Sequence, residues 1–464
     1  MDNKSANEYT DTWGLKGFCG RLSECLDLLG YSQEMILYRR ETQKKLDEIS
    51  NSKPYPAIYI ATGSKAEGTG LYFESDIDRM YVAKGVTCIQ EGFSYSRSNM
   101  FLLDKSSSSP GYTRLKLVHF YDTNSIISKY LVSEYKATYI ANSFSMLPEN
   151  FHMIDINGVR LSKKDKSGPS APYGNPSIKY DFVSAFECIC PDIIQEWVRR
   201  PRYNGWPDPR LIKHISSLEG HVVPVANKGS KFPETEWRIC FTKAELLLMH
   251  SLTEFQIKLY ILLKLISKSV LQPLCSEISS YVMKNIVFWT VETNPKEKFS
   301  QSFLIVRLID CLIYLKDCLQ SNNLRNYMIA HRNLFEGRVS ECEREKLVKK
   351  IDELLSEKEN IFQHCDKIRV AMVKLKESPQ EFAMEAKKRD KIEKLVYNKN
   401  VTFRETYFPG LTAKALQDRL NASTVYTDYE KTLTELIVPD QIDIANRGQN
   451  LADVFTKRMS SILS

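Results

Sequence analysis

The chain has 464 residues, of which 43% are hydrophobic and 26% charged, and its net charge at pH 7 is +7. This is an ordinary globular composition, and the length suits roughly two or three domains with a sizeable core. The mild positive excess permits contact with nucleic acid or anionic lipid but requires neither.

The cysteines and apolar stretches indicate where the protein works. The eleven cysteines are scattered without a CxxC pair, and residues 1–11 carry no apolar core of the kind that a secretion signal needs. We therefore expect free thiols and a cytosolic or nuclear protein, with the cytoplasm as the predicted location. The apolar stretches 244–252, 259–266 and 303–315 are each interrupted by charge, so we expect no membrane partner.

The first part of the chain reads as a mixture of helix and strands. Leucines spaced along residues 15–50 predict one long helix, and the prolines of "SNSKPYP" end it. Three short strands are then predicted at 57–62, 75–83 and 112–122. The serine-rich stretch "DKSSSSPG" reads as a loop before the third of them.

In the rest of the chain the sequence pattern changes twice. Residues 161–177 are dense in turn formers and predict a loop, which is followed by a strand at 179–188. From Asp208 the apolar pattern has the longer period of helices, and beyond Ser378 the sequence is charged and irregular. This predicts an α+β protein with an α/β part at 1–207, a helical part at 208–377 and a charged C-terminal extension at 378–464.

The pair Gly63-Ser64 follows the first predicted strand. A glycine there lets backbone N–H groups approach a phosphate, and the serine hydroxyl adds a donor. The chain has no GxxxxGK[ST] sequence, so this is not a Walker loop. The alternative interpretation is a plain turn.

Two aspartates, Asp76 and Asp78, stand one residue apart in the next predicted strand. Residues at this spacing share a face, and two adjacent carboxylates repel unless a cation lies between them. A third carboxylate from a neighbouring strand would complete a site for two-metal phosphoryl transfer, and Asp181 is the candidate. The alternatives are an ordinary surface pair and an ordinary aspartate at a strand start.

These residues stand in a longer set of familiar segments. The set comprises "GSKAEG", "SDIDRM", "DFVSAFE", "EWVRRPRYNGWP", "VVPVANKGSKFPETEWRICFTKAE", "YILLKLI", "SSYVMKN" and "NYMIAHRNLF". In their order and spacing they resemble the Mab-twenty-one family of nucleotidyltransferases, which includes cyclic GMP-AMP synthase and the animal cGAS-like receptors. The resemblance extends from the N-terminal helix to about residue 375. It implies a bilobal, polymerase-beta-like nucleotidyltransferase fold with a helical C-terminal lobe.

The resemblance also implies roles for individual residues. Gly63 and Ser64 would hold a triphosphate, and two magnesium or manganese ions would bind Asp76, Asp78 and Asp181. The remaining positions match contacts to the nucleotide: Arg238 and Glu245 to bases, Lys264 to phosphate, and Ser280 and Tyr281 to a base on which the ring stacks. Taken alone, Arg238 would be an ion-pair partner, Glu245 and Lys264 solvated helix residues, and Tyr281 a core residue.

One interval departs from the pattern of the vertebrate DNA sensor in this family. That protein carries a zinc-binding insertion of His and Cys between the positions matched by Glu245 and Lys264. Here the interval contains His250 and no cysteine, so we expect no structural zinc.

The resemblance suggests a nucleic-acid activator. In related enzymes the N-terminal helix borders a groove for duplex nucleic acid, and its shift orders the loop that carries Glu67 and Gly68. The absence of the zinc insertion favours double-stranded RNA over double-stranded DNA. The candidate contacts are two basic clusters, whose alternative interpretation is a solvated face: Arg39, Arg40, Lys44 and Lys45 in the first, and Arg199, Arg200, Arg202 and Lys213 in the second.

The function implied is synthesis of a cyclic dinucleotide from ATP, GTP or other nucleoside triphosphates, as a second messenger of innate immunity read by a STING-like receptor. Two alternatives remain open. One is a catalytically silent binding or developmental protein with the same fold, and the other is an oligoadenylate synthetase-like nucleotidyltransferase. Clustered carboxylates that repel without metal argue against the silent protein.

Overall fold

The computed structural model describes residues 12–93, 99–121, 126–134, 137–147, 153–154, 160–163, 170–174, 179–447 and 449–463. Helices and strands are mixed along the first half, and helices alone follow Cys240 in the described residues. The α+β class predicted from the sequence is thereby confirmed.

The helix predicted over residues 15–50 is two helices, so that prediction is wrong. Helix α1 (Thr12–Leu26) ends in a single π-helical turn, Asp27–Tyr31, and α2 (Gln33–Asn51) follows. Gly30 has a φ of 97°, a left-handed conformation in which glycine ends helices without strain. Ser32 then caps α2, since its Oγ accepts a hydrogen bond from the Met35 N–H at 3.3 Å.

The sheet is centred on the long strand β2 (Ile77–Ile89). On one side, β2 pairs antiparallel with β1 (Ala57–Thr62) and, further along, parallel with β3 (Asn99–Asp104). On its other side β2 pairs parallel with β10 (Lys179–Ile189). The path β2-β3-β4-β12-β11-β10 returns to β2 through that pairing, so these strands form a closed ring.

The other strands extend or complete this ring. They are β4 (Tyr112–His119), β5 (Leu131–Glu134), β6 (Ala137–Ile140), β7 (Met153–Ile154), β8 (Arg160–Lys163), β9 (Ser170–Gly174), β11 (Gly220–Val223) and β12 (Glu236–Cys240). Two predictions need correction here. The stretch 161–177, expected to be loop, contains β8 and β9 in its described residues, and the boundary at 208 does not end the sheet, because β11 and β12 follow it.

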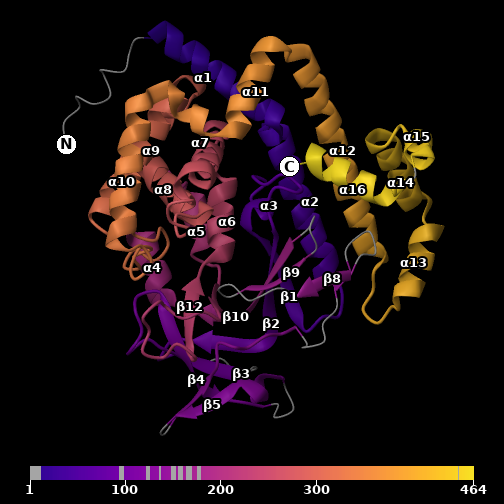
Figure 1. Ribbon diagram of the computed structural model, residues 1–464. Coiled ribbons are helices and arrows are strands. Elements are labelled where there is room, and N and C mark those ends of the chain that lie inside the picture. The colour runs from indigo at the N-terminus through magenta and orange to yellow at the C-terminus, as the bar shows by residue number, and fades with distance from the viewer. Residues whose placement is uncertain are drawn as a thin grey trace.

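Helices cover one end of the sheet and share a core with it (Figure 1). They are α4 (Pro191–Arg199), α5 (Pro209–Ile215), α6 (Thr242–His250), α7 (Glu254–Ile266), α8 (Ser280–Thr293), α9 (Leu304–Gln320), α10 (Glu341–Glu357) and α11 (Asp366–Glu377). Helix α7 is buried on nearly every face, as expected for an apolar helix at the centre of a bundle. The common core runs from Phe186 and Trp237 in the sheet to Ile257 and Leu312 in the helices.

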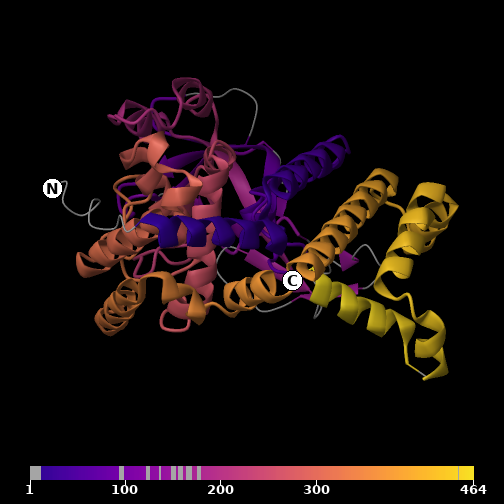
Figure 2. The same ribbon diagram turned by 90° about the horizontal axis from the view of Figure 1, so that it is seen from above.

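The segment beyond Ser378 is helical, so the prediction of an irregular extension is wrong. It forms α12 (Pro379–Thr406), α13 (Ala413–Ala422), α14 (Thr424–Ile437), α15 (Gln441–Asn446) and α16 (Leu451–Ile462). These helices lie together on one side of the molecule in two perpendicular views (Figures 1 and 2). They have a core of their own that includes Val396, Leu433 and Met459 and that also takes in Tyr72.

All eleven cysteines carry free thiols, as predicted. Among the described residues no single helix has the length and hydropathy of a bilayer span. The pair α6 and Glu254–Leu271 meets both criteria only when taken together, across a bend of 118°.

Candidate active site

The three aspartates singled out by the sequence lie at the junction of β2 and β10. Asp76 immediately precedes β2, and the parallel register places Asp181 of β10 opposite Asp78 of β2. Burial, together with Asp181 and Asp76, raises the pKa of Asp78 to about 7. Burial also raises the pKa of Asp181, and Asp76 adds to the effect. The strand pairing therefore creates a cluster of carboxylates whose negative charges oppose one another.

The donor set of this cluster fits a magnesium or manganese ion. Carboxylate oxygens are the ligands that these ions prefer, and a divalent charge relieves the repulsion that raises the pKa of Asp78. In the described part of the chain, no three His, Cys, Asp or Glu side chains stand in a finished ligand arrangement. Asp181 accepts a hydrogen bond from Ser170 Oγ at 2.8 Å.

Gly63 lies directly against this cluster, at the start of the short helix α3 (Gly63–Ala66). Its φ is 65°, and a Cβ at this position would lie 2.0 Å from Asp78 Oδ2. Glycine is required for both reasons. The backbone beside it is therefore close enough to Asp78 for one ligand to touch both.

Ser64 faces the loop that follows α3. Its Oγ donates to Ser75 Oγ at 2.8 Å, and its carbonyl accepts hydrogen bonds from the N–H groups of Thr69 and Gly70 at 2.9 and 3.0 Å. A Cβ on Gly70 would lie 2.4 Å from Ser75 Oγ. Two serine hydroxyls thus stand together beside the carboxylates, where they can donate to phosphate oxygens.

One cleft of about 750 Å³ brings almost all the predicted site residues together. Gly63, Ser64, Asp76 and Asp78 line its sheet side. The helical side and strand β12 contribute Arg238, Glu245, Lys264, Ser280 and Tyr281. Asp181 is not among the lining residues, although it lies opposite Asp78.

Tyr281, at the start of α8, is held by its hydroxyl. Tyr281 Oη donates to Glu245 Oε1 at 2.9 Å and accepts from Asn326 Nδ2 at 2.7 Å. Burial raises the pKa of Glu245 despite this hydrogen bond and the nearby Lys284. These contacts fix the ring at the cleft wall, in the way that a stacking platform for a base requires.

The cleft also contains cations that the sequence reasoning missed: Lys179, Lys268, Lys284, Arg332 and Arg338. Lys284 forms a buried ion pair with Glu67. It lies four residues after Ser280 and hence on the same helix face, a spacing that could have identified it. Burial lowers the pKa of Arg238, and the nearby Arg332 adds to the effect. An anionic group bound beside Arg238 and Arg332 would relieve the repulsion between them.

The first predicted nucleic-acid cluster is only half exposed. Arg39 is completely buried and pairs with Glu393, so the prediction that it contacts nucleic acid is wrong. Arg40 is 8% exposed, and its guanidinium donates to the carbonyls of Glu67 and Met249, so the same correction applies. Lys44 and Lys45 are exposed, as the prediction requires.

The second cluster is divided in the same way. Arg199 and Lys213 are exposed, whereas Arg200 and Arg202 share Glu292 as an ion-pair partner at 2.9 and 3.0 Å. Arg200 is thus half-buried and ion-paired, and its contact with nucleic acid stays a prediction.

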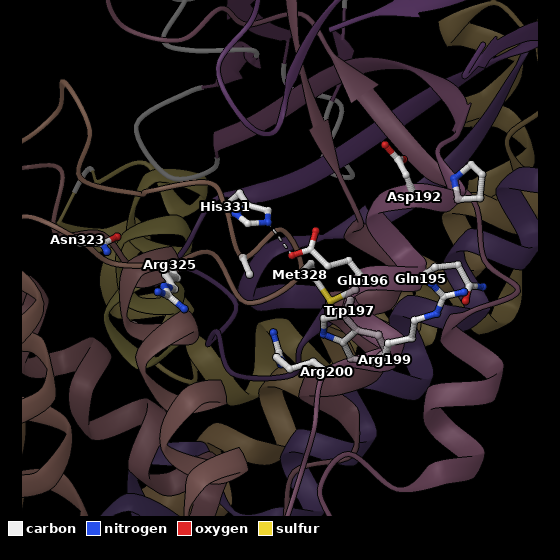
Figure 3. A pocket seen from close by; sticks show the side chains of 12 residues that line it. Asp192, Gln195, Glu196, Trp197, Arg199, Arg200, Asn323, Arg325, Met328 and His331 are labelled. Atoms are coloured by element: carbon white, nitrogen blue, oxygen red, sulfur yellow. Dashed lines mark ion pairs between the residues drawn. The ribbon is translucent and has the colours of Figure 1, made fainter. Parts of the chain in front are cut away.

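Arg199 and Arg200 line a separate open cavity of about 1030 Å³ between α4 and residues 323–331 (Figure 3). There, His331 Nε2 lies 3.0 Å from Glu196 Oε1. The cavity contains none of the predicted catalytic residues.

A comparison with protein families identifies the helical part of the cleft. Residues 248–353 match the family model described as the Mab-21 protein HhH/H2TH-like domain. The matched region includes α7 to α9 and most of α10, with the cleft residues Lys264, Ser280 and Tyr281. Residues 248–353 are thus similar to the C-terminal domain of the Mab-21 family, which is nucleotidyltransferase-like.

Proposed function

We propose that this protein is a nucleotidyltransferase that joins two nucleoside triphosphates, ATP and GTP or related nucleotides, into a cyclic dinucleotide. The observation that carries the proposal is the register of β2 and β10, which sets Asp181 opposite Asp78 in front of Gly63 and Ser64. Three carboxylates beside a glycine and a serine hydroxyl are the groups that metal-assisted phosphoryl transfer needs.

The site residues predicted from the sequence would have the following roles in this reaction. Asp76, Asp78 and Asp181 would hold two magnesium or manganese ions, which supply electrostatic stabilisation of phosphoryl charge when bound. Ser64 and the backbone after Gly63 bind the triphosphate, and Lys264 with Arg238 offsets its charge. Tyr281 stacks on a base and Glu245 accepts hydrogen bonds from it.

Each nucleotide transfer would form one bond to phosphorus and break another. A ribose hydroxyl oxygen of one nucleotide bonds to the α-phosphorus of the other, and the bond from that phosphorus to the pyrophosphate oxygen breaks. The hydroxyl proton would leave to a carboxylate oxygen, and we propose Asp181 as the acceptor because it lies opposite Asp78 in the strand register. A second transfer in the opposite sense closes the ring and releases a second pyrophosphate.

We also propose a nucleic acid that activates the enzyme and a receptor that binds its product. Double-stranded RNA is the proposed activator, and its contacts would be the four exposed basic residues Lys44, Lys45, Arg199 and Lys213. The product would act in the cytoplasm on a STING-like receptor in innate immunity. No structural zinc is required for this mode of binding, because duplex RNA is bound through phosphates and 2′-hydroxyls.

Incubation with labelled nucleotides tests the proposal. Purified protein is given the four nucleoside triphosphates with magnesium or manganese, with and without duplex RNA or DNA. A cyclic dinucleotide has no terminal phosphate, so the expected product resists alkaline phosphatase. Linear oligomers would indicate an oligoadenylate synthetase-like enzyme, and the absence of product under all conditions would indicate a silent Mab-21-type protein.

A further inference from the structure

The C-terminal helices contact the loop that borders the proposed active site. We define the cleft loop as residues 67–75, which connect α3 to β2 and of which Glu67, Glu74 and Ser75 line the cleft. Helix α12 packs along α2, where Tyr38 Oη donates to Asn398 Oδ1 at 2.8 Å (Figure 1). Residues of α2 and α12 that are more than 300 positions apart in the sequence therefore lie side by side next to the cleft loop.

A buried ion pair joins α12 to the start of the cleft loop. Arg39 Nε and Nη2 donate to Glu393 Oε1 and Oε2 at 2.9 and 2.6 Å, and the two side chains are 0% and 1% exposed. Arg39 Nη1 donates to the Gly68 carbonyl at 3.3 Å. Glu393 therefore fixes the guanidinium that in turn holds the loop backbone.

The far end of the loop is attached to the same C-terminal helices. The Phe73 N–H donates to the Leu463 carbonyl at 3.2 Å, and Asn400 Nδ2 donates to Tyr72 Oη at 2.6 Å. Tyr72 is 4% exposed and belongs to the core of the C-terminal helices, where its ring meets Tyr397 edge-on at 5.2 Å. Hydrogen bonds thus hold the cleft loop at Gly68 and again at Tyr72 and Phe73.

The position of the cleft loop determines how Ser64 and Ser75 lie at the proposed triphosphate site. Gly68 has a φ of 76°, and a Cβ there would lie 2.5 Å from the Ile36 carbonyl of α2, so the loop lies tightly against that helix. Ser75, two residues after Phe73, accepts the hydrogen bond from Ser64. A shift at Gly68 or Phe73 would separate the two serine hydroxyls, which line the same cleft as Asp76 and Asp78.

We propose that Glu393 is a positioning residue for the nucleotide site: through Arg39 it holds the cleft loop in the conformation that binds the substrate triphosphate. The inference rests on the proposed function for the identity of the ligand. It gives the C-terminal extension, for which the sequence indicated no role, a part in the active site. The extension then acts in cis, as a fixed support of the loop.

The test compares Glu393→Gln with Glu385→Gln in the full-length protein. Glu385 is on the same helix, but its partner Lys374 and its own side chain are 43% and 50% exposed, so it is a matched control. The readouts are amide hydrogen exchange in residues 67–75, exchange in α9 as a measure of global stability, and the Kd for ATP with magnesium. We expect Glu393→Gln to speed loop exchange by about tenfold or more and to weaken ATP binding at least about fivefold, with α9 unchanged.

A second variant keeps the test decisive if Glu393→Gln folds poorly. In the double variant Arg39→Met with Glu393→Met, an apolar pair replaces the buried charges, so folding is retained while Gly68 loses its donor. The same increase in loop exchange is expected there.

Unchanged loop exchange, or faster loop exchange with unaltered ATP affinity, would overturn the inference in either variant. Equal increases in the loop and α9 would overturn it if the double variant also shows them. Failure of the wild-type protein to bind ATP with magnesium would overturn the proposed function instead.

Discussion

The raised pKa of Asp78 makes the stability of the metal-free protein depend on pH. Its pKa is raised to about 7 from an ordinary 3.8 by burial and by Asp181 and Asp76. Between these two values the folded protein retains a proton that the unfolded chain has lost. The free energy of unfolding of the metal-free protein should therefore fall as the pH rises from about 4 to 7.

The variant Asp78→Asn removes this penalty. In EDTA at pH 8 we expect it to unfold with a free energy roughly 1–3 kcal/mol higher than that of the wild type, and at pH 4 we expect little difference. Urea unfolding followed by circular dichroism measures both values. Added magnesium should stabilise the wild type and leave the variant nearly unchanged. A variant less stable than the wild type at pH 8 would show that the carboxylates do not repel.

Tyr281 separates the role of a ring from that of a hydroxyl. Tyr281→Phe keeps the ring but removes the partner of Glu245 and Asn326, so we expect a loss of about 1–2 kcal/mol of stability and little change in nucleotide affinity. Tyr281→Ala also removes the stacking surface and should weaken nucleotide binding by roughly 1–3 kcal/mol. Calorimetric titration with nucleotide distinguishes the two. Equal loss of affinity in both variants would assign the effect to the hydroxyl.

At the scale of elements, α2 has two faces with different roles. Arg39 and Arg40 point into the protein, whereas Lys44 and Lys45 are exposed with only weak surface pairs, Lys44 to Glu48 at 3.9 Å and Lys45 to Glu405 at 3.4 Å. Such pairs contribute little to stability. Any duplex that approaches this helix would therefore meet Lys44 and Lys45 and not the two arginines.

Charge reversal tests this surface. Lys44→Glu with Lys45→Glu should weaken binding of duplex RNA and reduce the slope of log K against log salt by about 2. Lys346→Glu with Lys349→Glu, also exposed and on α10, is the matched control and should change little. Filter binding over a range of salt concentrations measures the slope. The same loss in both double variants would indicate an effect of net charge alone.

How much of the structure can be predicted from the sequence differs from one element to the next. The carboxylates and the Gly63-Ser64 pair could be predicted, because the chemistry demands certain residue types at short spacing. The burial of Arg39 could not, since its partner Glu393 lies 354 positions away. For α12 the signal was present: Phe382, Ala386, Ile392 and Val396 are buried along it at helical spacings, but the many charges around them obscured the pattern.

At the scale of the whole molecule, the cleft is formed where the sheet side meets the helical side. The buried ion pair between Glu67 of the cleft loop and Lys284 of α8 joins the two. Burial opposes ionisation of both groups, yet Lys284 lowers the pKa of Glu67, and Glu67 with Glu245 raises that of Lys284. Each charge is stable there only because the other is present.

Breaking this pair should weaken the whole fold. Lys284→Met leaves Glu67 buried without its partner and is expected to lower the free energy of unfolding by about 3–5 kcal/mol. The double variant Lys284→Met with Glu67→Gln removes both charges and should recover much of that loss. Urea unfolding of the wild type, the two single variants Lys284→Met and Glu67→Gln, and the double variant measures the coupling. Additive effects of the two substitutions would contradict it.

Release of pyrophosphate tests the central claim, that the carboxylate cleft transfers nucleotides, most directly. Each transfer liberates one pyrophosphate, which a coupled enzymatic assay counts whatever the bases or linkage. With ATP, GTP, magnesium and duplex RNA, we expect steady release by the wild type and at least about a hundredfold less by Asp76→Asn with Asp78→Asn, at equal circular dichroism. Equal rates in the two proteins would contradict the account.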